Sequence, residues 1–172
     1  MKKKIVLMLT VIMLIGLAGC GKNQINIKET GTSDNNEQMV QNIYENKRTE
    51  VKQKISEIKE RLPETSAEDK GTCGSKAKWY YKDNTLIIYG EGVITEDTWH
   101  KSNIVINTVV IDSGITKLGN NMFSGLGSEV GKNIENFYIA DGLEEIGSST
   151  FVNCDCLSEI VLPPSLYFID GY

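Results

Sequence analysis

The side chains that could do chemistry are few, and their spacing matches no common catalytic motif. The chain has a single histidine, His100, which stands beside Trp99 and lacks a second histidine for a proton relay or zinc site. Carboxylates gather at Asp141, Glu144 and Glu145, but no sequence neighbour would shift their pKa values toward acid–base catalysis. We therefore expect a solvated loop histidine, exposed turn carboxylates, and no enzymatic activity, cofactor, catalytic residue or metal site.

The cysteines give no metal-binding pattern either. Cys73, Cys154 and Cys156 show no Cys-x-x-Cys spacing. A disulfide from Cys73 to Cys154 or to Cys156 stays open for an exported chain, although it would join segments that are far apart in sequence. Because the number of these cysteines is odd, at least one thiol is expected to be free.

Charge argues against nucleic acid as a partner. The whole chain carries 18 Lys and Arg against 23 Asp and Glu, a formal net charge of −5. The excess of acid is concentrated from residue 71 onward, where 13 acidic residues face 6 basic ones. Such a surface repels a phosphate backbone.

The N-terminal stretch has the features of an export signal. A basic start, Lys2 to Lys4, precedes an apolar run from Ile5 to Ile15, which is too short for an ordinary membrane span of about 20 residues. The following Leu-Ala-Gly-Cys20 resembles a bacterial lipobox. That resemblance implies a lipoprotein signal peptide over 1–19 and lipid attachment at Cys20, where two or three acyl chains would hold the chain to a membrane. An uncleaved transmembrane helix is the alternative.

Composition then divides the chain further. Residues 20–35 are polar and predict a flexible tether, and residues 63–70 predict a linker after Pro63. Residues 36–62 contain no Gly or Pro and predict a helical stalk. Its apolar residues follow a heptad seam that Arg48 interrupts: Tyr44, Val51, Ile55, Ile58 and Leu62. The helix could serve as a spacer, as a dimerising coil with weak self-association, or as a helix packed back on the following domain.

Residues 71–104 predict a β-hairpin that caps the next domain. Trp79 and Tyr81 alternate with polar residues, a turn signal follows at 82–84, and apolar alternation resumes at Leu86 and Ile88. Trp79 and Trp99 are expected in the core of this cap. An aromatic platform for carbohydrate is the alternative for the two tryptophans.

Two stretches of the remaining chain repeat one pattern. Ile111–Phe123 and Ile139–Phe151 match as Ile/Ile, Gly/Gly, Ile/Leu, Leu/Ile, Gly/Gly and Phe/Phe at identical spacing, 28 residues apart (139 against 111). A partial third copy starts at Leu162, 23 residues after the second (162 against 139). Periods in the twenties predict a solenoid whose units bury their apolar rows against each other. Phe123 and Phe151 are expected inside its coils.

These residues resemble the BspA-type leucine-rich repeat family of bacterial surface proteins. The resemblance rests on Leu157-Ser-Glu-Ile160-Val-Leu-Pro163, on Leu143-Glu-Glu-Ile146-Gly147, and on Phe151-Val-Asn-Cys154. It implies a short, β-rich leucine-rich-repeat solenoid over 105–172, of about two and a half repeats, with a parallel ladder of short strands on one face. It also implies that Cys154 is a small buried residue.

The resemblance further implies a lipid-anchored protein on the bacterial cell surface that binds a host matrix protein or another cell. Contacts are expected from exposed strand-face residues, with Tyr138 as the strongest candidate: Val110, Asn136, Tyr138, Glu159 and Val161. Two alternatives stay open. The chain could be a truncated fragment of a longer repeat protein without activity of its own, or a lipoprotein enzyme acting at the cell wall.

Overall fold

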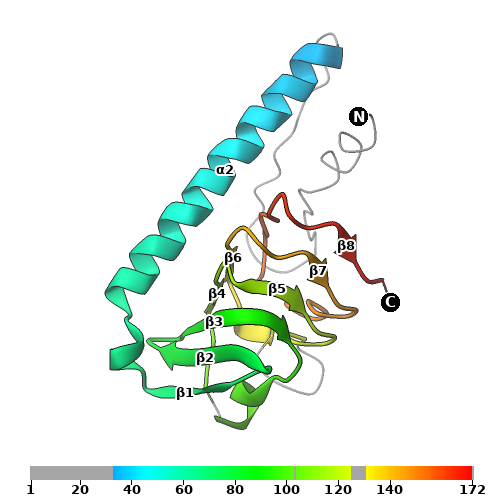
Figure 1. Cartoon of the computed structure of the whole chain (residues 1–172). Coiled ribbons are helices and arrows are strands. Elements are labelled where there is room, and N and C mark those ends of the chain that lie inside the picture. The colour runs from blue at the N-terminus through cyan, green and yellow to red at the C-terminus, as the bar shows by residue number, and fades with distance from the viewer. Residues whose placement is uncertain (1–32, 103, 125–130, 172) are drawn as a thin grey trace.

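The structure is a computed structural model that describes residues 33–102, 104–124 and 131–171. It is a β-solenoid of about three turns with one helix on its N-terminal side, as Figure 1 shows. The predicted signal peptide lies outside the described residues. The helices are α2 (Ser33–Arg61) and the 3-10 turns η1 (Glu64–Ser66), η2 (Thr98–Ser102) and η3 (Gly131–Asn133). The strands are β1 (Asp69–Thr72), β2 (Lys76–Lys82), β3 (Thr85–Ile94), β4 (Thr108–Ile111), β5 (Ile115–Leu118), β6 (Asn136–Ile139), β7 (Glu145–Ile146) and β8 (Phe168–Ile169).

The strands form two ladders that share β3. In the first ladder β1, β2 and β3 pair antiparallel, and β3, β4 and β6 then pair in parallel. In the second ladder the end of β3 pairs in parallel with β5, β5 with β7, and β7 with β8. The predicted parallel ladder of short strands is thus confirmed, and the first two coils contribute a strand to each ladder in turn.

Strand β3 can serve both ladders because a glycine lets it turn. Gly90 has a φ of +98°, and a Cβ at this position would lie 2.3 Å from the Lys76 carbonyl oxygen. Only glycine fits this left-handed, crowded corner without strain. The cap and the first coil are therefore one continuous structure rather than two joined domains.

The core consists of the inward side chains of successive coils. Ile111, Ile139 and Leu162 belong to one buried cluster, as the repeat alignment predicts. Phe123 is fully buried and Phe151 packs against the same cluster. Their rings continue a stack that starts at Trp99, with centroids 5.4 Å and then 6.4 Å apart and planes within about 12°. The aromatic positions thus align from the cap into the second repeat.

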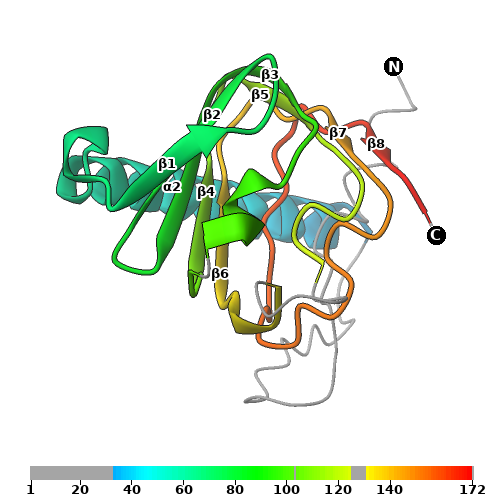
Figure 2. The same cartoon turned by 90° about the horizontal axis from the view of Figure 1, so that it is seen from below.

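Helix α2 lies across the outer face of the first ladder (Figures 1 and 2). Its seam residues, and Leu62 directly after its last residue, are buried in the heptad positions that the sequence indicates: Tyr44, Arg48, Val51, Ile55, Ile58 and Leu62. Of the three roles left open for this helix, the structure shows the third, a helix packed back on the following domain. The apolar seam of α2 packs against the outer face of the first ladder.

Two elements differ from the prediction. The linker 63–70 already contains the start of β1 at Asp69, so the cap has three strands rather than a two-stranded hairpin. The third repeat has no strand over residues 157–162, although Ile160 and Leu162 are buried in the core. In that repeat the strand pairing is made on the second ladder, by β8.

Candidate binding surface

The outward side of the first ladder carries an apolar row at equivalent positions of successive coils. Strand register aligns Ile87, Val110 and Tyr138, and the repeat spacing places Val161 next. We call these four residues the outer apolar row. Ile87 and Val110 are fully buried under α2, and Tyr138 and Val161 pack at the edge of the same cluster. An apolar row of this kind is stable in water only when it is covered.

The predicted contact residues therefore lie in different surroundings from those the sequence suggested. Val110 is fully buried rather than exposed, because α2 covers it. Tyr138 and Val161 are partly buried against the same cluster. Asn136 is exposed at the start of β6, and Glu159 forms an ion pair with Lys47 of α2.

A cleft opens between α2 and the last two coils of this face. It has a volume of about 340 Å³, and four of the five predicted contact residues line it. Helix α2 contributes one wall and the strand side contributes the other: Lys47, Glu50, Val51 and Lys54, opposite Glu135, Asn136, Phe137, Tyr138, Ser158, Glu159 and Val161. Apolar side chains and charged or amide side chains both line the cleft.

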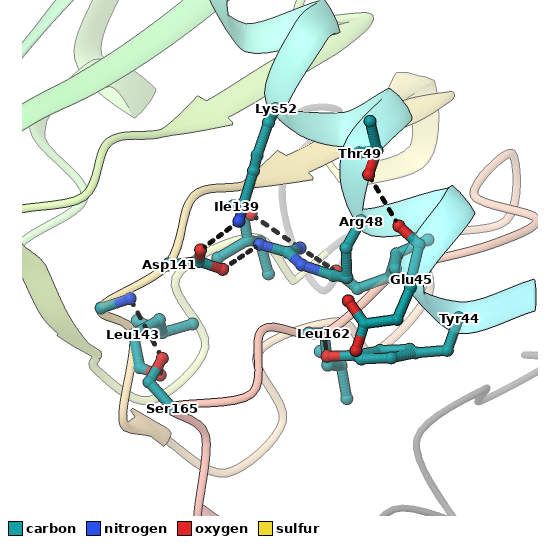
Figure 3. A network of polar contacts seen from close by, with 12 residues as sticks. Tyr44, Glu45, Arg48, Thr49, Lys52, Ile139, Asp141, Leu143, Leu162 and Ser165 are labelled. Carbon is teal, nitrogen blue, oxygen red and sulfur yellow. Dashed lines mark hydrogen bonds and ion pairs between the residues drawn. The ribbon is translucent and has the colours of Figure 1, made fainter. Parts of the chain in front are cut away.

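The helix is fixed beside this cleft by polar contacts, drawn in Figure 3. Arg48, which is 3% exposed, donates from Nη1 to the carbonyl oxygens of Ile139 and Val161, each at 3.0 Å. Its Nη2 lies 2.7 Å from the Asp141 carboxylate, which Lys52 also approaches at 2.7 Å. One turn earlier, the Tyr44 hydroxyl donates to the Leu162 carbonyl oxygen at 2.9 Å.

These contacts change the ionisation of Asp141. Partial burial tends to raise its pKa, but hydrogen bonds and charge from Lys52 and Arg48 outweigh that effect, so the pKa lies below its ordinary value. The sequence offered no neighbour that would shift the pKa of this carboxyl; the groups that lower it come from α2 instead. Both cations come from a helix about 90 residues away in sequence, so the only available signal was the charge at the Arg48 seam position.

The remaining reactive side chains are integrated into the cap and core. Trp79 and Trp99 are buried, as expected for core residues. His100 is partly buried rather than solvated, and its Nδ1 lies 2.9 Å from the Asp97 carboxylate. Within residues 33–102, 104–124 and 131–171, no group of three His, Cys, Asp or Glu side chains is placed to hold a metal ion.

The three cysteines of the described chain are free thiols. Cys73 and Cys154 are buried, and burial raises the pKa of each to about 12, with a smaller contribution from Glu96 and Asp155 respectively. Cys156 is exposed. The Cys154 thiol donates to the Phe123 carbonyl oxygen at 3.2 Å, in keeping with its predicted role as a small core residue.

The predicted N-terminal sites lie outside the described residues. These are the signal peptide 1–19, the lipid-attachment site Cys20, and most of the tether 20–35, whose last three residues belong to α2. In the part of the chain that the structure describes, no helix is both long enough and apolar enough to cross a membrane.

Comparisons with known proteins were made at the level of structure, curated sequences and family models. A solved leucine-rich repeat protein from Eubacterium ventriosum ATCC 27560 is 24% identical with a TM-score of 0.41, and the match covers 49% of this chain and 23% of that one. A comparison with curated proteins finds no match. The family model for the BspA type leucine rich repeat region (6 copies) matches residues 87–172, a stretch that begins within β3. Since this match spans half of the 172 residues, the chain belongs to the BspA-type leucine-rich repeat family.

Proposed function

We propose that this protein is a cell-surface lipoprotein, anchored through Cys20, whose repeat domain binds a protein partner in adhesion. Membership of the repeat family supports a binding role, because stacked repeats offer an extended, rigid surface. The basic and apolar start of the chain and the lipobox-like residues before Cys20 support export and anchoring. A host matrix protein or a protein on another cell is the proposed partner.

The observation that carries the proposal is the cleft between α2 and the last two coils. Asn136, Tyr138, Glu159 and Val161 line it together, although they come from two repeats. Tyr138 offers a partly exposed aromatic ring, and tyrosine is frequent among residues that dominate binding energy. The partner would therefore contact a composite surface made by both helix and strands.

Binding to immobilised host matrix proteins, such as fibronectin and collagen, tests this role. The full chain should be used, because removing α2 would expose Ile87 and Val110. We expect Tyr138→Ala to weaken binding at least about tenfold, which corresponds to about 1.4 kcal/mol. Lys76→Ala is a suitable control, since Lys76 is 72% exposed on the cap, away from the cleft. Equal binding by both variants would contradict the cleft as the contact surface.

Anchoring is tested separately in the producing cell. We expect Cys20→Ser to remove acyl-chain labelling and to move the protein from the membrane fraction to the soluble fraction or the medium. Retention of the label by this variant would exclude Cys20 as the lipid-attachment site. A serine cannot form the thioether, whereas the rest of the export signal is unchanged.

A further inference from the structure

The first ladder has a regular main-chain hydrogen bond at the end of each coil. The residue that follows the strand donates its N–H to the last residue of the coil before that pairs in parallel with this strand. Asp112 donates to the Ile88 carbonyl oxygen at 2.9 Å, and one coil later Ala140 donates to the Ile111 carbonyl oxygen at 2.9 Å. The strand register, Ile88 with Ile111 and Ile111 with Ile139, makes the two bonds equivalent.

The next coil breaks this rule because of its sequence. Leu162 follows Ile139 in the repeat alignment, so the residue that should donate to the Ile139 carbonyl oxygen is Pro163. Proline has no N–H. Pro163 is itself buried, and among the described residues no main-chain hydrogen bond joins residues 158–162 to β6. A buried carbonyl group without a donor destabilises a fold.

Helix α2 supplies the missing donor. The Nη1 atom of Arg48 lies 3.0 Å from the Ile139 carbonyl oxygen and 3.0 Å from that of Val161, so one nitrogen bridges the two coils. Nη2 is held by Asp141 at 2.7 Å. A planar guanidinium with several fixed N–H groups can serve two carbonyls and a carboxylate at once, which a lysine ammonium does poorly.

We infer that Arg48 takes the place of the backbone amide that Pro163 lacks, and that it is the positioning residue of the cleft. Lys47, Glu50, Val51 and Lys54 line the cleft and lie within two turns of Arg48 on the same helix. The bond to Ile139 therefore fixes which helix residues face Tyr138 and Val161. By this inference α2 is a permanent wall of the cleft, and a binding partner does not displace it. That the cleft binds a partner at all rests on the proposed function.

A double-mutant cycle between Arg48 and Pro163 tests the inference on the full chain by chemical denaturation. Pro163→Ala restores an N–H at the critical position. We expect Arg48→Met to lower the denaturation midpoint strongly in the wild-type background, and by less than half as much in the Pro163→Ala background. In the doubly substituted chain, the amide of residue 163 should exchange at least tenfold more slowly than in an unfolded peptide. Equal midpoint shifts in both backgrounds, or an unprotected amide, would overturn the inference.

Two further variants make the cycle decisive. Val51→Ala removes a neighbouring seam residue and should shift the midpoint equally in both backgrounds, since Val51 makes no hydrogen bond to the third coil. Arg48→Lys replaces Arg48→Met if the latter does not fold, and it should show the same dependence on residue 163 with a smaller shift. Because the cycle measures stability, a failure to bind any matrix protein would count against the proposed function and leave this result standing.

Discussion

The two ladders of the solenoid present contrasting outer faces. On the first ladder the outer apolar row, Ile87, Val110, Tyr138 and Val161, lies under α2 or at its edge. On the second ladder the equivalent outward row is formed by Val93, Lys117, Glu145 and Phe168, and α2, the long helix of the described residues, lies on the other face. Both rows come from the same repeats, so the repeat architecture alone does not decide which face is available to a partner.

The difference follows from the side chains of each row. Lys117 and Glu145 form an ion pair at 2.6 Å from coil to coil, and the Tyr167 hydroxyl donates to Glu145 at 2.9 Å. This row satisfies its polar groups at the surface. The outer apolar row cannot do so, and it requires burial against another element. Within a repeat protein, an outward apolar row therefore indicates a covered face, and the open face is the one with cross-coil polar pairs.

The largest expected effect comes from placing a charge on each face. Val110→Asp introduces a carboxylate beneath α2 with no cation in the packed row, and we expect it to lower the free energy of unfolding by about 4 kcal/mol or more. Val93→Asp, at a position that is 37% exposed, should cost less than about 1 kcal/mol. Equilibrium denaturation compares the two. Similar losses of unfolding free energy in the two variants would contradict the conclusion that only the first face is covered.

A smaller effect is expected from shortening side chains on the covering helix. Ile58→Ala removes a buried seam residue and should lower the free energy of unfolding by about 2–4 kcal/mol. Met39→Ala, on the same helix but 43% exposed, should change it by no more than about 0.5 kcal/mol. If both substitutions were neutral in thermal or urea unfolding, the helix would not contribute to the stability of the domain.

The smallest effect concerns one ion-paired carboxylate on each face, Asp141 beneath α2 and Glu145 on the second ladder. Since the pKa of Asp141 is lowered in the folded chain, its ion pairs stabilise the fold at neutral pH. That stabilisation is lost as the pH falls through the ordinary carboxyl value of 3.8 and below. Asp141→Asn should therefore flatten the loss of stability between about pH 5 and about pH 3.

Glu145→Gln is the matched change on the second face. Hydrogen bonds from Lys117 and Tyr167 lower the pKa of Glu145, so the direction of its effect is the same. Asp141 has two cationic partners, one of them buried, whereas Glu145 has one cation and a phenol. We expect the flattening to be smaller for Glu145→Gln. Unfolding curves recorded across this pH range check the prediction. A larger flattening for Glu145→Gln than for Asp141→Asn would contradict it.

Much of the fold can be predicted from the sequence because the same apolar pattern occurs in successive repeats. The spacing of Ile111, Ile139 and Leu162 gave the core rows, and the aligned Phe123 and Phe151 gave the stack inside the coils. The helix was predicted over 36–62 and runs from Ser33 to Arg61. Each of these predictions depends on a local period, which is visible in a single sequence.

The candidate site was harder to predict because it depends on contacts between distant segments. The heptad seam showed that α2 needs an apolar partner, but a seam does not say which surface supplies it. The sequence alone therefore predicts an exposed Val110, which the structure shows to be buried beneath α2. Arg48 interrupts the apolar seam in the sequence, and its carbonyl partners, Ile139 and Val161, lie 91 and 113 residues further along the chain. Neither half of that arrangement is informative without the other.

The span of α2 also bears on how such a protein can evolve. At one end the Tyr80 hydroxyl donates to the Leu62 carbonyl oxygen, and at the other the Tyr44 hydroxyl donates to that of Leu162. Adjacent strands are spaced by about 4.8 Å, whereas the helix rises about 1.5 Å per residue. Duplicating one coil between β2 and Leu162 would move Tyr80 and Leu162 further apart. A helix of unchanged length could then no longer make both hydrogen bonds. The length of α2 therefore fixes the number of coils between β2 and Leu162, and gene duplication can add coils only outside this stretch.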